Sequence, residues 1–232
     1  MMKKDRISHA DRMAVFRDQV DIYPVSCQRL ARGRSDRQWL DAVLSGGARV
    51  VQLRDKESPD RELLAKARYF REQTRQAGAL FLVNDRVDIA LLSGADGVHL
   101  GQDDLPPGKV RRIAPEMIIG LSCNTEAQAR QIGEMARKPD CPVSYYNIGP
   151  IYPTGTKEGL KAFLGVDAIG AFSSYSDLPF TVMGGIKKEH VAELVAAGAR
   201  RIAVVTAITA ADDMAAATAE LGRLIRAAAG KE

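Results

Sequence analysis

Charged side chains follow several short apolar runs of the sequence, at the point where each run ends. Arg54 and Lys56 follow one run, Asp85 follows the next, and Asp104 lies a few residues beyond a third. Guanidinium and ammonium groups side by side are typical of phosphate recognition. Two carboxylates suffice to hold Mg²⁺, which completes its shell with phosphate oxygens and water. If the runs converge, these residues predict a site for a phosphorylated ligand and Mg²⁺.

Two further segments contain groups that bind phosphate. Lys157 lies in a threonine-containing loop, and Gly184-Gly185 follows another apolar run. Glycine lets a backbone approach a phosphate closely, so that N–H groups can donate to it. The sequence shows no obvious Ser-His-Asp or Cys-His arrangement, which is expected if catalysis consists of charge stabilisation and positioning.

Each of these features also has a simpler structural interpretation. Asp85 could cap a helix or form an Asx turn, and the acidic pair before Leu105 could cap the next helix, with Asp103 doing only that. Arg54 and Lys56 could form a solvated salt-bridge cluster with Asp55. His99, in an apolar run, is more typical of a packing residue than of a base, and His9 and His190 lie in polar segments typical of a surface.

The apolar runs themselves predict parallel strands covered by helices. They are short and apolar on both faces, as strands buried on both sides are. Amphipathic segments typical of helices occupy residues 60–77, 109–114, 125–136 and 188–197 between them. The predicted strands are residues 21–25, 48–53, 80–83, 97–99, 117–120, 145–148, 180–183 and 202–205.

The number of these units favours a (β/α)₈ TIM barrel, an α/β fold, with residues 20–232 as a single catalytic domain. A doubly wound sheet shares the alternation, but no G-x-G-x-x-G opens the first unit. Residues 1–19 form a short N-terminal extension that could be helical and could pack on the barrel or on a partner subunit. In a barrel all strand ends meet at one rim, where chemistry takes place.

Composition limits the classes of function. With 46% hydrophobic residues among 232, one sizeable core can form, and no apolar run is long enough to span a membrane. A net charge of only +4 with interspersed signs gives no support for nucleic-acid binding. Three cysteines without a CxxC pair suit free thiols in the cytoplasm. Oligomeric state stays open, a homo-oligomer included.

The strand-end motifs, in order, resemble those of the thiamine phosphate synthase family. The resemblance covers residues 21–208, and its specificity comes from the order and spacing of the series rather than from any one motif. The family has the (β/α)₈ fold and is a transferase of thiamine biosynthesis that joins hydroxymethylpyrimidine pyrophosphate to thiazole phosphate, with Mg²⁺. The series is VQLRDK (51–56), VNDRVD (83–88), GADGVHLGQDDLP (94–106), GPIYPTGTK (149–157) and GGI (184–186).

The resemblance implies a role for each matching residue. Asp85 and Asp104 would hold Mg²⁺ against the pyrophosphate, and Gln52 would orient the pyrimidine. Ser122 would lie near the reacting carbon and the leaving group, so that it counts as catalytic together with Arg54 and Lys157. The remaining substrate contacts would be Lys56 and Asn84 on the pyrophosphate, Thr154 and Thr156 on the thiazole, and the backbones of Gly185, Val205 and Thr206 around its phosphate.

Three positions depart from the family pattern. Asn124 stands where the family often has His, Thr206 where it usually has Ser, and Ser26-Cys27 where Thr-Asp is more usual. The first two leave substrate fit open. One alternative is a thiazole tautomerase, a paralogous isomerase that resembles the synthase, generally lacks the magnesium acids and relies on a His at the position of Asn124. The other is a non-catalytic barrel that binds a phosphorylated ligand.

Overall fold

A computed structural model describes residues 7–155 and 163–230 of the chain. Within them, eight parallel strands form one sheet in the order β1-β8-β7-β6-β5-β4-β3-β2. Every predicted strand is present, with ends that move by three residues or fewer. The strands are β1 (Ile22–Pro24), β2 (Val50–Leu53), β3 (Leu80–Asn84), β4 (Gly97–Leu100), β5 (Ile118–Cys123), β6 (Tyr145–Ile148), β7 (Phe180–Val182) and β8 (Ile202–Val204).

The sheet closes on itself. Strand β1 pairs with β8, and a bridge from Val25 to Gln52 joins the end of β1 to β2. The Ser26 N–H also donates to the Gln52 carbonyl at 2.9 Å. Closure between the first and second strands confirms the predicted (β/α)₈ barrel over the doubly wound sheet.

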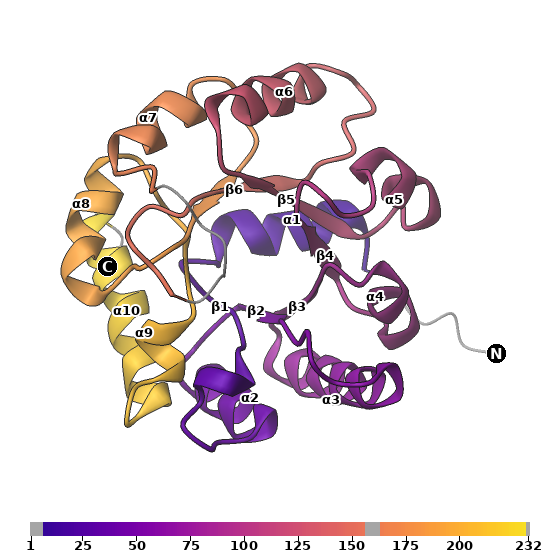
Figure 1. The fold of residues 1–232 in the computed structure, drawn as a ribbon, viewed down its shortest axis with the longest axis vertical. Coiled ribbons are helices and arrows are strands. Elements are labelled where there is room, and N and C mark those ends of the chain that lie inside the picture. Colours follow the sequence, from indigo (N-terminus) through magenta and orange to yellow (C-terminus); the bar gives the residue numbers. More distant parts are fainter. Residues whose placement is uncertain (1–6, 156–162, 231–232) are drawn as a thin grey trace.

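Helices surround the barrel on its outer side, as Figure 1 shows. The segments predicted as helices are helical, and Gly78 ends α3 in the left-handed conformation at φ 66°. The surrounding helices are α2 (Asp36–Ser45), α3 (Asp60–Ala77), α4 (Val87–Ser93), α5 (Pro107–Ile113), α6 (Glu126–Ala136), α7 (Asp167–Ser173), α8 (Val191–Ala196) and α10 (Met214–Ala228), with short turns η1 (Gln28–Leu30), η2 (Lys188–His190) and α9 (Thr206–Thr209).

The strands bury both faces, which explains why they are continuously apolar. Outward residues such as Val51 and Tyr146 pack under the helices in the larger core. Inward residues such as Val50, Leu82 and Tyr145 form a second core inside the barrel. Alternate residues of one strand therefore belong to different cores, and the inner core ends where polar residues begin.

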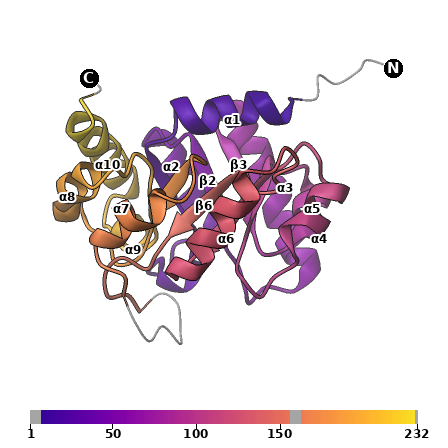
Figure 2. The same ribbon diagram turned by 90° about the horizontal axis from the view of Figure 1, so that it is seen from above.

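Helix α1 (His9–Asp18) covers one end of the barrel, across the strands in Figures 1 and 2. A capping box between Ser8 and Asp11 begins it. Phe16 is fully buried in the inner core, with its ring centroid 4.6 Å from that of Tyr145. Arg201, which immediately precedes β8, donates to the carbonyls of Phe16 and Arg17 at 2.8 and 2.7 Å. These bonds satisfy carbonyls at the end of the helix.

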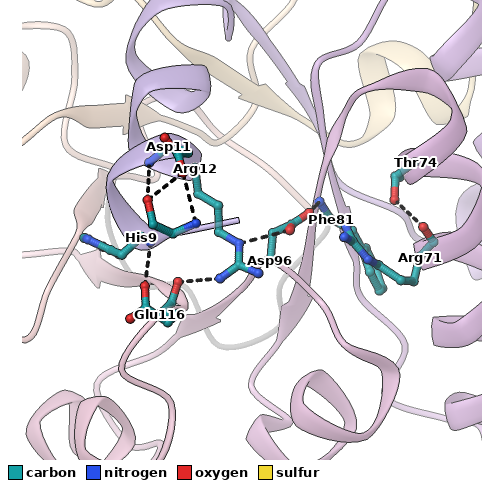
Figure 3. Close-up of polar contacts among 9 residues, drawn as sticks. His9, Asp11, Arg12, Arg71, Thr74, Phe81, Asp96 and Glu116 are labelled. Carbon is teal, nitrogen blue, oxygen red and sulfur yellow. Dashed lines mark hydrogen bonds and ion pairs between the residues drawn. The ribbon is translucent and has the colours of Figure 1, made fainter. Parts of the chain in front are cut away.

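Buried ion pairs fix α1 against residues that precede the strands, as Figure 3 shows. The Asp96 carboxylate accepts from Arg12 at 3.1 Å, from Arg71 at 2.6 Å and from the Phe81 N–H at 3.0 Å. His9 donates its backbone N–H to Glu116, and its ring contacts Ser144. The prediction that His9 is a surface residue is therefore wrong: burial, and then the charge of Arg111, lower its pKa.

No helix in the described part of the chain is long and apolar enough to cross a membrane. Thr156 and Lys157, both predicted to bind substrate, lie outside the described residues, as does most of the 154–161 loop.

Candidate active site

A pocket of about 300 Å³ opens at the carboxyl ends of the strands, opposite α1. All predicted site residues that the structure describes line it, which is the arrangement expected at a barrel rim. They are Gln52, Arg54, Lys56, Asn84, Asp85, Asp104, Ser122, Thr154, Gly185, Val205 and Thr206.

Asp85 is held in an uncommon backbone conformation. Its φ is +61°, a region that residues with a Cβ seldom occupy and that is often found at functional sites. Its carboxylate lies 3.2 Å from the Lys56 ammonium group. Helix α4 has Arg86 at its N-cap without a side-chain cap, so Asp85 does not cap that helix. Nor does Asp103 cap α5, whose N-cap is Pro106.

Asp104 faces Asp85 across the ends of β4 and β3. It accepts a 2.6 Å hydrogen bond from the Gly101 N–H. Burial raises the pKa of Asp104, and the adjacent Asp85 carboxyl raises it further against the lowering effect of the Gly101 N–H. Two neighbouring carboxyl groups are a suitable oxygen donor set for a divalent cation. Among the described residues no set of three or more acids, histidines or cysteines could enclose a metal. Mg²⁺ would therefore need phosphate oxygens of a bound substrate, and water, to complete its coordination shell.

The turn after β2 presents Arg54 and Lys56 to the pocket. Between them, Asp55 points away and pairs with Lys66 of α3 at 2.8 Å, which corrects the expected Arg54–Asp55–Lys56 cluster. Hydrogen bonds from Lys66, Ser58 and Glu57 outweigh burial and lower the pKa of Asp55. The Arg54 N–H donates to Ser26 at 2.9 Å, while its guanidinium has no partner among the residues described. The turn is fixed by its backbone and by Asp55, which leaves the Arg54 guanidinium available to a ligand.

The opposite side of the pocket is mostly backbone. Gly184 and Gly185 have φ of 109° and 63°. A Cβ on Gly184 would lie 2.5 Å from Pro150, and one on Gly185 would lie 2.3 Å from the Pro153 carbonyl oxygen. Both glycines are therefore required for the loop after β6 to pack here. Val205 and Thr206, at the start of α9, complete this side.

Polar side chains between the two sides form a floor. His99 lines the pocket, and its ring nitrogens contact Tyr145 at 2.8 Å and Ser122 at 3.1 Å. His99 is thus a hydrogen-bonded residue that packs on Tyr145, as interpreted, and it also lines the pocket, which the interpretation did not include. The sequence did offer a signal for this position. His99 is the register partner of Asn84, a predicted site residue, and register partners on neighbouring strands lie on the same face of a sheet.

Two amides were missed or left open by the sequence analysis. Asn147 lines the pocket from β6 and accepts from Thr181 at 2.8 Å. Asn124 donates to the Gly149 carbonyl at 2.5 Å, so it supports the loop after β6 as well as lining the pocket. The neighbouring Cys123 faces the outer core, and burial raises the pKa of its thiol to about 12, which excludes it as a nucleophile near neutral pH.

Comparison with known proteins adds independent support. Residues 22–208 match the thiamine monophosphate synthase family. A thiamine-phosphate synthase of Pelotomaculum thermopropionicum is 40% identical over 89% of this chain and 93% of its own, and one of Methanoculleus marisnigri is 41% identical over 90% and 96%. A thiamine phosphate pyrophosphorylase structure from Pyrococcus furiosus superposes with a TM-score of 0.82 at 30% identity, over 92% of this chain and 98% of the other. From fold, ordered motifs and these relatives together, the chain belongs to the thiamine monophosphate synthase family.

Proposed function

We propose that the chain is a thiamine phosphate synthase, a transferase that couples hydroxymethylpyrimidine pyrophosphate to thiazole phosphate and releases pyrophosphate. The observation that carries this proposal is the division of one pocket into two sides. Cations and carboxylates line the side at β2–β4, and glycine-rich backbone lines the side at β7 and β8. Such a division suits two phosphorylated substrates that react between the two sides.

On the charged side, Arg54, Lys56 and Asn84 bind the pyrophosphate, and Gln52 orients the pyrimidine. Lys157 contributes a further cation. Ser122 lies between the two sides, beside the reacting carbon and the leaving group. The thiazole phosphate is held by Thr154, Thr156 and the backbones of Gly185, Val205 and Thr206.

Asp85 and Asp104 would hold Mg²⁺, whose positive charge neutralises the charge that develops on departing pyrophosphate. The two neighbouring carboxyl groups, whose charges have the same sign, supply the donor set described above. Lys56 contacts Asp85 and lines the same pocket, so its ammonium group can also pair with a phosphate oxygen there.

The thiazole nitrogen is already a nucleophile, so the chain needs no strong base. Catalysis is then a dissociative substitution: fixed cations stabilise the pyrophosphate as its bond to the pyrimidine carbon breaks, and the pocket holds the thiazole nitrogen where it forms the new bond to that carbon. A pocket floor of hydrogen-bonded side chains keeps those groups oriented before the substrates bind.

The test is to incubate the pure protein with both substrates and Mg²⁺ and to measure thiamine phosphate and pyrophosphate. Equal amounts of the two products, dependent on Mg²⁺, are expected. Isomerisation of thiazole carboxylate phosphate without these products would assign the chain to the tautomerase. Binding without any turnover would leave the non-catalytic barrel.

A further inference from the structure

One chain of hydrogen bonds crosses the barrel beneath the pocket. The Gln52 amide donates to the Tyr23 hydroxyl at 2.8 Å, and that hydroxyl lies 3.0 Å from the Tyr145 hydroxyl. Tyr145 in turn contacts Nδ1 of His99 at 2.8 Å, and Nε2 of His99 contacts Ser122 at 3.1 Å. The chain thus links side chains of β2, β1, β6, β4 and β5 and ends at the pocket.

The geometry of these hydrogen-bonded side chains favours one direction of donation along the series. The Gln52 amide nitrogen can only donate, so the Tyr23 oxygen accepts from it. Among the described residues, the acceptor for the Tyr23 hydrogen is then the Tyr145 oxygen, and Tyr145 donates its own hydrogen to Nδ1 of His99. The reverse order would leave the buried Tyr23 hydrogen without an acceptor, which is the more costly arrangement.

The consequence reaches Ser122. With Nδ1 of His99 accepting, the neutral ring carries its hydrogen on Nε2 and donates it to the Ser122 oxygen. The Ser122 hydroxyl hydrogen has no acceptor among the described residues, and Ser122 lines the pocket. Its hydrogen is therefore available to a ligand oxygen.

Two further features fix the arrangement. Burial raises the pKa of Tyr23 to about 12 and raises the pKa of Tyr145 well above its usual value, so both stay hydroxyls at neutral pH. Gly120 makes room for the Tyr145 ring, because a Cβ there would lie 2.3 Å from the ring carbon Cζ. Tyr145 can thus reach the barrel axis only because β5 has glycine beside it.

We propose that Tyr23, Tyr145 and His99 are positioning residues, which order the protons of this chain so that Ser122 presents its hydroxyl hydrogen to the anionic oxygens of the bound pyrophosphate. The identity of the ligand rests on the proposed function, whereas the proton order rests on the geometry alone. None of the three needs to transfer a proton during the reaction.

The order can be measured directly in the ligand-free protein. The sequence has three histidines, so ¹⁵N NMR of the imidazole nitrogens can assign each of them with a His99→Gln variant as reference. Wild-type protein is expected to carry the His99 hydrogen on Nε2. A hydrogen on Nδ1 would overturn the proposal, whether or not the protein proves to be a synthase.

Tyr145→Phe and Tyr23→Phe test the function of the chain. In Tyr145→Phe, His99 should no longer keep a single tautomer. The kcat should fall by about ten- to a hundredfold, because one hydrogen bond to a charged group is then misdirected. The KM for the thiazole substrate should stay unchanged. Tyr23→Phe should give a smaller loss in the same direction. Unchanged kcat in both variants would refute the role of the chain.

Tyr146→Phe is the matched control. Tyr146 is the next residue on β6, faces the outer core and has a buried hydroxyl without a hydrogen-bond partner in the described part of the chain. This variant should leave the His99 tautomer and kcat as in wild type. Binding of inorganic pyrophosphate with Mg²⁺, measured by calorimetry, should weaken several-fold in Tyr145→Phe and stay unchanged in Tyr146→Phe. This readout stands even if no synthase activity is found.

Discussion

Histidine and serine side chains are hydrogen-bonded at both ends of the barrel, and the two pairs differ in what else the serine contacts. At the end covered by α1, Ser144 accepts from the Ile119 N–H at 3.0 Å and from Arg111 at 2.9 Å, so its own hydrogen goes to His9. At the open end, the Ser122 hydroxyl has only His99 as a partner among the described residues. The covered end commits its polar groups to the protein, and the open end leaves some of them to a ligand.

The same contrast holds for the carboxylates. Asp96, beneath the barrel, accepts from two arginines and a backbone N–H. Asp85 and Asp104, at the rim, face each other with Lys56 as the cation beside them. A carboxylate with a complete set of donors stabilises the fold, whereas two carboxylates with too few donors gain stability when a cation binds. Substitutions at the two ends should therefore separate stability from activity.

The largest effect is expected at the rim. Asp85→Asn and Asp104→Asn should each lower kcat by about a hundredfold or more, because each removes charge from the site that stabilises the leaving group. Unfolding in urea should show stability changes below about 1 kcal/mol, since the Asp85 ion pair involves the exposed Lys56 and the new amide in Asp104→Asn can still accept from the Gly101 N–H. Asp103→Asn, exposed on the same pocket edge, is the control. Wild-type rates in both rim variants would contradict the assignment.

Asp96→Asn should give the opposite result. Removal of one member of a buried ionic cluster typically costs about 3–5 kcal/mol, because Arg12 and Arg71 would keep buried charges without a partner. The folded variant should retain its kcat. Asp212→Asn removes an exposed pair with Arg32 and should cost less than about 1 kcal/mol. A comparable loss of kcat in Asp96→Asn would mean that the covered end is not independent of the rim.

Phe16→Leu sharpens the comparison, because the Phe16 ring packs on Tyr145 from below. The substitution keeps an apolar side chain and should cost about 1 kcal/mol of stability. Since Tyr145 is also held by its hydrogen bonds, kcat should stay within about twofold of wild type. Denaturant unfolding and steady-state kinetics on one preparation check both numbers, and a larger fall in kcat would show that α1 supports the pocket floor.

The smallest effect concerns pH. Burial, then Arg111, lower the pKa of His9 from 6.5, while Glu116 raises it and Arg12 and Arg17 lower it further. Below pH 6.5 the unfolded chain binds a proton at His9 that the folded protein does not yet bind. Protonation therefore favours the unfolded chain, so the free energy of unfolding is highest above pH 6.5 and decreases as the pH falls through that value. When the pH is lowered from about 7.5 to about 5.5, the free energy of unfolding should decrease more in wild type than in His9→Gln. The difference between the two decreases should be below about 1 kcal/mol. Equal slopes for the two proteins in urea melts would contradict this.

The rim was predictable because two simple sequence patterns define it, the apolar runs and the polar residues that follow them. Apolar runs located all eight strands, and polar residues at their ends had to meet at one end of a parallel barrel. The position of Asp85 on the rim follows from this, but its positive φ does not, because Asp occupies that region only when the surrounding structure requires it. The local sequence of Asp85 fits a helix cap equally well.

The floor was harder to predict. Tyr145 and Tyr146 are adjacent and identical in type, and only the register of β6 decides which enters the barrel. The role of Lys66 was also hidden, because it lies in a helix rich in exposed charges and reaches Asp55 only after α3 has packed on β2. Contacts of this kind depend on tertiary structure and leave no local pattern in the sequence.

Helix α1 has a consequence for the order of folding. Its partners lie far along the chain: Ser144 is 135 residues beyond His9, and Arg201 is 185 residues beyond Phe16. Contacts at such separations form late, because loop closure must precede them. Although α1 precedes every strand of the sheet in sequence, it cannot dock fully until β6 and β8 have formed. Complete docking of α1 therefore requires a complete barrel, and a chain that stops before Arg201 would lack the bonds to the carbonyls of Phe16 and Arg17.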